Sequence, residues 1–308
     1  MTMIDLTGRT AIVTGAGGGL GRAHALALAA HGARVVVNDL GDGARAVAQE
    51  IAANGGEAIV DGTDITDLAA VRAMVTDVEH RWGGLEILVN NAGILRDRSF
   101  AKMEMEDFRA VIEVHLMGSV HCAKAVWEGM RARRHGRIVF TTSSSGLFGN
   151  FGQANYAAAK MALVGLMQTL RLEGEKYGIR VNCLSPSAAT RMTEGLYGAD
   201  ELRQLDPALV APAIVALSAD DAPNGAILCA GAGSFESAKV LLTQGLLVNE
   251  PDAAAAILNR WPEIDDGRGA FVPLHGPDQF SHEIARASAQ PPLLAGQAAV
   301  PVSSAIAW

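Results

Sequence analysis

The chain has 308 residues, of which 49% are apolar and 19% are charged, and its formal net charge at pH 7 is −8. This apolar content is sufficient for a large core and excludes disorder as the state of most of the chain. The negative net charge argues against nucleic acid as the main partner, because phosphate binding needs a basic surface.

Cysteine spacing and the ends of the chain indicate the compartment. Cys122, Cys183 and Cys229 are odd in number, widely spaced and without a CxxC pair, so we expect neither a disulfide framework nor a metal site. The N-terminus lacks a basic segment followed by an apolar one, so no signal peptide is expected. Gly, Ser, Asn or Pro residues interrupt the uncharged runs 138–159 and 287–308, and neither predicts a membrane span. We therefore expect a cytoplasmic protein.

Strand and helix patterns alternate along most of the chain. Short apolar runs typical of buried strands occur at 10–14, 34–39, 58–61, 85–90, 137–142, 180–184 and 226–229. Between them lie Ala- and Leu-rich stretches with helical spacing, at 19–31, 43–53, 67–82, 104–132, 153–176 and 207–218. Strands that alternate with helices predict crossover connections and a parallel sheet. The expected fold class is α/β, a single doubly wound Rossmann-type domain with a parallel seven-stranded sheet.

The alternation stops after Gly233, where we expect an appended extension and not a second domain. Residues 1–233 would form the domain that binds a dinucleotide and carries the catalytic site, and 234–308 would form the C-terminal extension. Helical spacing continues in part of 234–265, whereas 266–308 are predicted to be loop-like because prolines interrupt the end of the chain.

A glycine-rich segment, Thr14–Gly21, lies between the first predicted strand and the first predicted helix. Gly15 permits a tight turn out of the strand, and Gly19 lets the backbone approach a pyrophosphate at the helix N-terminus. Gly21 lets the helix pack close to the strand. An ordinary flexible loop is the alternative, but the position between strand and helix favours a dinucleotide site.

Acidic residues after the second and third strands indicate how the dinucleotide would be recognised. Asp39 follows the last glycine of that segment by 18 residues, a spacing typical of an acid that binds the ribose 2′-hydroxyl. Its carboxylate would repel a 2′-phosphate, and 15–21 contains no Lys or Arg, so NAD is favoured over NADP as the cofactor. Asp39 capping the following turn is the alternative. Asp64 would bind the adenine amine, with Ile65 packing on the ring, or else cap a helix near Thr66.

Three residues predict proton transfer. Tyr156 and Lys160 share one face at the start of a predicted helix, and Ser143 lies 13 residues before Tyr156. A phenol has an ordinary pKa of about 10, and lowering it to about 7 requires about 4 kcal/mol. Burial opposes this change, whereas an ammonium about 4 Å away contributes about 4 kcal/mol at an effective dielectric constant near 20. Lys160, helped by a positively charged nicotinamide, is therefore predicted to make Tyr156 a general acid and base.

With these motifs the chain resembles the classical short-chain dehydrogenases/reductases over its first three quarters. Their TGxxxGxG motif corresponds to Thr14–Gly21, their NNAG motif to Asn90–Gly93, and their serine and YxxxK motif to Ser143, Tyr156 and Lys160. The resemblance implies NAD(P)-linked carbonyl and alcohol chemistry. It implies that Tyr156 moves the hydroxyl proton, Ser143 orients the substrate, and Lys160 binds the nicotinamide ribose and lowers the pKa of Tyr156.

The same resemblance extends the set of expected cofactor contacts beyond Asp39, Asp64 and Ile65. The further residues are Gly15, Gly18, Gly19, Leu20, Gly21, Asn91, Ala92, Gly93, Tyr156, Lys160 and Thr190. Thr190 should reach the nicotinamide amide, although the segment before it lacks the Pro-Gly pair that is common in the family.

His115 occupies the position at which the family usually has Asn, on the helix after the NNAG motif. If the family residue acts through its main-chain carbonyl, by holding a water beside the lysine, His115 does the same. If the side chain matters, the proton relay is altered, and a packing role is the third alternative. His115 is thus a candidate catalytic residue together with Ser143, Tyr156 and Lys160.

A narrower resemblance indicates a substrate. The dehydrogenase unit of peroxisomal multifunctional enzyme type 2 and its stand-alone bacterial relatives are similar in segments 17–41, 90–100, 114–119, 149–160 and 190–193. The resemblance implies NAD-dependent interconversion of a 3-hydroxyacyl-CoA, of 3R configuration, and the 3-oxoacyl-CoA. Arg96 and Arg98 would contact the CoA phosphates, or else form solvent-facing salt bridges.

Two other functions are compatible with the sequence. A hydroxysteroid or other secondary-alcohol dehydrogenase would use the same scaffold. A non-catalytic NAD-binding sensor would not need the triplet of Ser143, Tyr156 and Lys160. The family resemblance also implies a homodimer or homotetramer packed through the helices at 104–132 and 153–176, although their apolar residues equally fit burial on the sheet.

Overall fold

The computed structural model describes residues 4–189, 202 and 204–289, and the chain divides into two compact units. The first unit comprises Met1–Ala238 and the second comprises Lys239–Trp308. The sheet and all described residues of the candidate site lie in the first unit.

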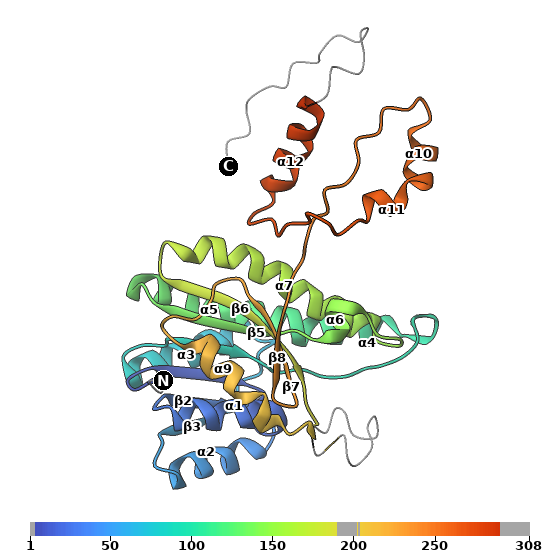
Figure 1. The fold of residues 1–308 in the computed structure, drawn as a ribbon. Coiled ribbons are helices and arrows are strands. Elements are labelled where there is room, and N and C mark those ends of the chain that lie inside the picture. Colours follow the sequence, from blue (N-terminus) through green and yellow to red (C-terminus); the bar gives the residue numbers. More distant parts are fainter. Residues whose placement is uncertain (1–3, 190–201, 203, 290–308) are drawn as a thin grey trace. The chain divides into compact units, whose positions relative to one another are not determined.

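One sheet organises the first unit (Figure 1). Its described strands occur in the order β3-β2-β1-β4-β5-β6-β7-β8. They are β1 (Thr10–Thr14), β2 (Arg34–Asn38), β3 (Ala58–Asp61), β4 (Ile87–Asn90), β5 (Gly136–Thr141), β6 (Ile179–Ser187), β7 (Ile227–Gly231) and β8 (Ser234–Ala238). All neighbours are parallel except β7 and β8. The strand order reverses between β1 and β4, and the carboxyl ends of strands at such a reversal are where doubly wound folds bind ligands.

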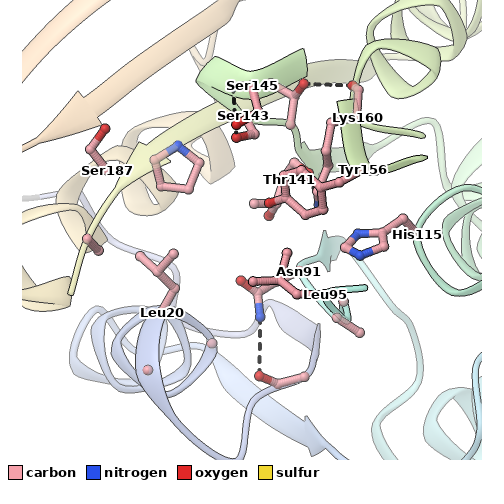
Figure 2. Close-up of a pocket in the computed structure, with 18 of the residues that line it drawn as sticks. Leu20, Asn91, Leu95, His115, Thr141, Ser143, Ser145, Tyr156, Lys160 and Ser187 are labelled. Atoms are coloured by element: carbon pink, nitrogen blue, oxygen red, sulfur yellow. Dashed lines mark hydrogen bonds between the residues drawn. The ribbon is translucent and has the colours of Figure 1, made fainter. Parts of the chain in front are cut away.

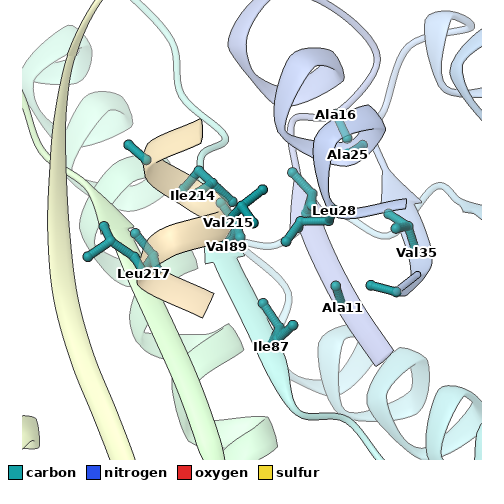
Figure 3. Packing of buried hydrophobic residues seen from close by; sticks show 14 of the residues in the cluster. Ala11, Ala16, Ala25, Leu28, Val35, Ile87, Val89, Ile214, Val215 and Leu217 are labelled. Atoms are coloured by element: carbon teal, nitrogen blue, oxygen red, sulfur yellow. The ribbon is translucent and has the colours of Figure 1, made fainter. Parts of the chain in front are cut away.

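Helices cover both faces of the sheet. One face carries α1 (Gly19–Ala30), α2 (Gly43–Ala53) and α9 (Ala211–Ser218), and the other carries α3 (Leu68–Trp82), α5 (Gly118–Arg133) and α7 (Ala154–Glu175). The core on the α1 side includes Leu28, Val89 and Ile214 (Figure 3), whereas Ile12 packs in the core on the other side with Val126. Because both faces of each central strand are buried, the strands are continuous apolar runs, as the sequence analysis predicts.

Shorter elements connect the main layers. They are the 3-10 turns η1 (Phe100–Lys102) and η4 (Pro207–Leu209), the π-helical turn η2 (Glu113–Met117), α4 (Met105–Ile112) and α6 (Ser144–Phe148). The predicted helix 104–132 is thus α4 and α5 joined through η2, which contains His115. Such π-helical turns are frequent at functional sites.

The prediction of seven strands, all parallel and ending before residue 234, is wrong by one strand. An eighth strand, β8, pairs antiparallel with β7, and Gly231 lies opposite Ser234. Ala232 and Gly233 join the two strands with φ values of 51° and 79°. A two-residue connection with two positive φ values has the twist of a hairpin turn. Alanine rarely adopts this conformation, so the turn carries no sequence signal.

The second unit is small and contains more helix than the sequence analysis predicts. Its described helices are α10 (Ala253–Asn259), α11 (Trp261–Ile264) and α12 (Pro277–Ser288). Leu242 and Phe271 form an isolated antiparallel bridge. The loop-like prediction for 266–308 is wrong at α12, which begins with a proline at the first helical position, a favourable start signal. Within the described residues of both units, no helix is long and apolar enough to span a membrane.

We expect the substitution Leu28→Ala to lower the free energy of unfolding by about 2–5 kcal/mol, since Leu28 is completely buried between α1 and the sheet. Leu40→Ala is the matched control, because this leucine is 71% exposed. Urea unfolding without nucleotide measures both variants, and equal losses of stability would contradict the position of this core.

Candidate active site

A cavity of about 470 Å³ lies in the first unit at the carboxyl ends of β1, β4, β5 and β6 (Figure 2). Most residues that the sequence analysis predicts for cofactor binding and catalysis line it together. They are Gly15, Gly18, Gly19, Leu20, Gly21, Asp39, Asn91, Ala92, Gly93, His115, Ser143, Tyr156 and Lys160. Thr190 lies outside the described residues.

The glycine-rich segment forms a close-packed cradle at the start of α1. Gly15 has a φ of +65°, and a Cβ atom there would lie 2.8 Å from Ala92 Cα. A Cβ atom on Gly21 would collide with the carbonyl oxygen of Gly15. The N-cap residue of α1, Gly18, provides no side-chain cap, and the first turn contains no acid. A helix N-terminus that has no side-chain cap and is lined by glycine backbone can bind the pyrophosphate of a dinucleotide.

Asp39 lines the cavity beside this cradle and accepts two backbone hydrogen bonds. Its Oδ2 accepts from Gly17 N at 2.8 Å, and its Oδ1 accepts from Gly41 N at 2.8 Å. Asp39 therefore does cap the following turn, and the same contacts fix the carboxylate at the edge of the cavity. A carboxylate has further lone pairs, so both interpretations of Asp39 are compatible with this geometry.

The two residues expected at the adenine do not line the cavity. Asp64 Oδ1 accepts hydrogen bonds from the backbone N and the Oγ1 of Thr66, at 2.9 and 2.8 Å, in the turn before α3 and not as a helix cap. Asp67, not Asp64, is the N-cap residue of α3. Ile65 is 6% exposed and belongs to the core, where its side chain fills the space above Gly118. Adenine binding by Asp64 and Ile65 stays a prediction.

Asn91 joins the two strands at which the sheet order reverses. Its Nδ2 donates to the carbonyl oxygens of Thr14 and Gly15, at 2.9 and 3.2 Å. In return, Thr14 Oγ1 accepts hydrogen bonds from the backbone N of Asn91 and of Ala92. The asparagine thus positions the glycine-rich segment against the end of β4.

Ser143, Tyr156 and Lys160 lie around one part of the cavity (Figure 2). Ser143 is the N-cap residue of α6, directly after β5, and Tyr156 lies in the first turn of α7. Lys160 Nζ is 5.5 Å from the centre of the Tyr156 ring and donates to Thr141 O at 2.6 Å. The predicted sharing of one helix face is confirmed, and the lysine also binds the end of β5.

Burial dominates the electrostatics of this group. It raises the pKa of Tyr156, as Asp97 also does, while a hydrogen bond with Ser143 lowers it. Burial lowers the pKa of Lys160 from 10.5 to about 7. The expected net lowering of the pKa of Tyr156 is thus not found in the protein alone, because desolvation of the phenolate outweighs the other contributions.

His115 projects its side chain to the cavity and is 1% exposed. Its Nε2 lies 2.8 Å from Ile94 O and 3.0 Å from Ile94 N, and its ring meets the Tyr156 ring edge-on at 5.1 Å between centres. Its carbonyl accepts from Ser119 Oγ at 2.7 Å. Burial, reinforced by Lys160, lowers the pKa of His115 to about 3. The imidazole is therefore neutral at physiological pH and has no proton to release as a cation.

Several lining residues were not singled out by the sequence analysis. They are Thr141, Thr142, Ser144, Ser145, Asn150, Gln153 and Pro186. Leu95, Ser187 and Ala188 also line the cavity, and they belong to segments 94–100 and 187–204, which the sequence predicts beside the substrate. Gln153 had a usable signal, because it precedes Tyr156 by three residues, or about one helical turn. Of the two arginines expected near CoA, Arg96 forms an exposed ion pair with Asp107 at 3.5 Å, which is the solvent-facing alternative.

We expect Lys160→Met to raise the free energy of unfolding at pH 6 by on the order of 5 kcal/mol. The buried ammonium costs free energy only while it is charged, and the unfolded chain holds its proton up to the ordinary pKa of 10.5. The cost is therefore complete below pH 7 and disappears as the pH rises toward 10.5. Urea unfolding at several pH values measures the effect, with the exposed Lys124→Met as control. A gain in stability that does not vary with pH would contradict this origin.

Comparisons with known proteins identify the family of the chain. Residues 9–199 match the family model described as short chain dehydrogenase. A protein of Mycobacterium tuberculosis, whose name describes a short-chain type dehydrogenase/reductase, is 43% identical over 276 residues, covering 86% of this chain and 96% of that protein. Peroxisomal multifunctional enzyme type 2 of Mus musculus is 40% identical over 280 residues, covering 86% of this chain but 38% of that enzyme.

A solved structure gives the same result. A 7α-hydroxysteroid dehydrogenase complexed with NADH and 7-oxo glycochenodeoxycholic acid matches with a TM-score of 0.70 and 31% identity, covering 75% of this chain and 95% of that chain. The present chain spans 30–45% of the length of the multifunctional peroxisomal relatives from yeast, mouse and fly. The chain belongs to the short-chain dehydrogenase family and is an NAD(P)-dependent oxidoreductase that acts on CH–OH groups.

Proposed function

We propose that the chain interconverts (3R)-3-hydroxyacyl-CoA and 3-oxoacyl-CoA thioesters with NAD as the cofactor. The observation that carries the reaction type is that Ser143, Tyr156 and Lys160 line the same cavity as the glycine-rich segment. The substrate class is supported by the similarity to peroxisomal multifunctional enzyme type 2, over 86% of this chain. We assign both cofactor binding and catalysis to the unit that ends at Ala238.

The proposed cofactor residues are those that line the cavity. NAD, when bound, would supply the nicotinamide carbon that accepts the hydride. The glycine-rich segment would hold the pyrophosphate at the N-terminus of α1, and Lys160 would bind the nicotinamide ribose. Asp39 would bind the hydroxyls of the other ribose, and the repulsion between its carboxylate and a 2′-phosphate supports NAD over NADP.

Tyr156 would take the hydroxyl proton of the substrate, while Ser143 donates a hydrogen bond to the same oxygen. The 5.5 Å between Lys160 Nζ and the ring centre corresponds to an attraction of about 3 kcal/mol between ammonium and phenolate. That attraction opposes the effect of burial, which raises the pKa of Tyr156. Because the pKa of Lys160 itself is about 7, the two groups would titrate as a coupled pair.

We also propose that the chain forms a homodimer or homotetramer through α4, α5 and α7. Met161 and Leu172 on α7 are each 40% exposed, and Met105 on α4 is 52% exposed. Met161 and Leu172 are eleven residues apart, or about three turns, so they share one helix face. Exposed apolar side chains on one face support a contact with another copy.

The substrate is tested by measuring NADH formation with (R)- and (S)-3-hydroxyacyl-CoA thioesters and with free steroid alcohols. We expect turnover of the (R)-thioesters, with NAD preferred to NADP. Turnover of steroids alone would support the second function, a hydroxysteroid dehydrogenase, which the similarity to the 7α-hydroxysteroid enzyme favours. Turnover of (S)-thioesters alone, or preference for NADP, would contradict the proposed stereochemistry or the role of Asp39.

We expect Tyr156→Phe to reduce kcat by about 10²- to 10⁴-fold, since it removes the acid–base group. The phenylalanine ring can keep the edge-on contact with His115, so the Kd for NADH should stay within about twofold. Steady-state rates and NADH fluorescence titration measure the two quantities. If wild-type protein binds NADH but oxidises no alcohol in the panel, the chain acts as a sensor and the enzymatic proposal fails.

We expect Gly21→Ala to weaken NADH binding at least about tenfold. The added Cβ would collide with the Gly15 carbonyl oxygen and lie 2.7 Å from Asn91 Nδ2, which displaces the cradle. Gly62→Ala is the matched control, because a Cβ there meets no atom within 4 Å. Calorimetric titration measures both, with circular dichroism as a check on folding. An unchanged Kd in Gly21→Ala would show that the dinucleotide does not bind here.

A further inference from the structure

A chain of polar side chains extends along the wall of the cavity beside Ser143. Gln153 is at its centre: its Nε2 donates to Asp97 Oδ2 at 2.6 Å. Its Oε1 accepts from Ser145 Oγ at 2.8 Å and from Asn150 Nδ2 at 3.0 Å. Ser145, Asn150 and Gln153 all line the cavity. Ser145, Asn150 and Gln153 have no role in the proposed reaction.

The chemistry of these groups determines the direction of every hydrogen bond among them. A carboxylate only accepts, so Asp97 fixes the amide of Gln153 with its nitrogen toward the carboxylate. The amide oxygen of Gln153 then accepts the hydrogen bond that the Ser145 hydroxyl donates. The Ser145 hydroxyl can therefore only accept a further hydrogen bond. The second hydrogen of Gln153 Nε2 has no partner among the described residues. Gln153 thus offers the cavity a donor that Ser145 lacks.

Two hydrogen bonds to backbone carbonyl oxygens hold the segment around Asp97, so that its carboxylate can fix the amide of Gln153. Arg98 N donates to Gly152 O at 2.9 Å. Asn155 Nδ2 donates to Arg96 O, also at 2.9 Å. The segment that carries Asp97 is therefore fastened to the start of α7 on both sides of the carboxylate. A donor held in this way loses little freedom when it binds a ligand, which increases its contribution to binding.

We propose that Gln153 is a specificity-determining residue that donates a hydrogen bond to the thioester carbonyl oxygen of the substrate. This inference rests on the proposed function, in which Ser143 and Tyr156 bind the oxygen on carbon 3. One carbon separates that centre from the thioester carbonyl, and about one helical turn separates Tyr156 from Gln153. The thioester oxygen can only accept, so it needs a donor, and the fixed amide provides one.

The test compares two substrates in the full-length protein. One is a (3R)-3-hydroxyacyl-CoA, and the other is the thioether analogue, in which a methylene group replaces the thioester carbonyl. We expect Gln153→Met to lower kcat/KM for the thioester by about 10- to 100-fold, as for a lost hydrogen bond in a desolvated site. For the thioether the change should stay within about twofold. The Kd for NADH should not change.

Two further variants separate this role from a structural one. Gln153→Glu keeps the size of the side chain but replaces the donor with a carboxylate next to Asp97, so we expect a larger loss with the thioester. Gln168→Met makes the same change as the first variant at a half-buried position of α7 that does not line the cavity. This control should leave both substrates and the NADH affinity unchanged.

The outcomes distinguish this inference from the proposed function. Equal losses with the two substrates, or no loss with the thioester, in an otherwise active enzyme would overturn the role of Gln153 and leave the reaction intact. Wild-type protein that oxidises no hydroxyacyl thioester would overturn the proposed function and this role with it. A selective loss with the thioester supports both.

Discussion

The buried ammonium of Lys160 is the constraint on which the geometry of the site depends. The residue is 2% exposed, and its Nζ donates to Thr141 O at 2.6 Å. An isolated charge at such a position is costly, and burial lowers its pKa to about 7. The charge is favourable only next to a fixed acceptor and a group that becomes anionic. The end of β5 provides the first, and Tyr156, one helical turn away, provides the second.

Hydrogen bonds between elements keep these groups in register. Thr142 Oγ1 donates to Lys160 O at 2.7 Å, which ties α7 to the end of β5. Asn91 and Thr14 connect β4 to β1 in the same way on the cofactor side of the cavity. The catalytic and cofactor halves of the site are thus joined through neighbouring strands of one sheet, so a change at either strand end should affect both.

Residues whose roles follow from spacing could be predicted from the sequence, whereas roles that depend on solvation could not. Tyr156 and Lys160 share a face because of helix geometry, and the predicted helix 43–53 coincides with α2. The turn at Ala232 has a backbone conformation that alanine rarely adopts, so its sequence does not predict it. The spacing shows that Gln153 lies about one turn before Tyr156, but not that it contacts Asp97, which is 56 residues away. The same holds for Ile65, because an apolar residue after a strand can pack on a ligand or in the core.

The pKa of Tyr156 depends on burial and on nearby charges, which a sequence pattern does not show. Burial and Asp97 raise it, and Ser143 lowers it, so the protein alone favours the neutral phenol. A single ammonium at 5.5 Å contributes about 3 kcal/mol in favour of the phenolate, against the effect of burial. A second positive charge, such as that of an oxidised nicotinamide ring, would favour the phenolate further. In the proposed reaction the oxidised cofactor and Lys160 would therefore act together to make the phenol a stronger base.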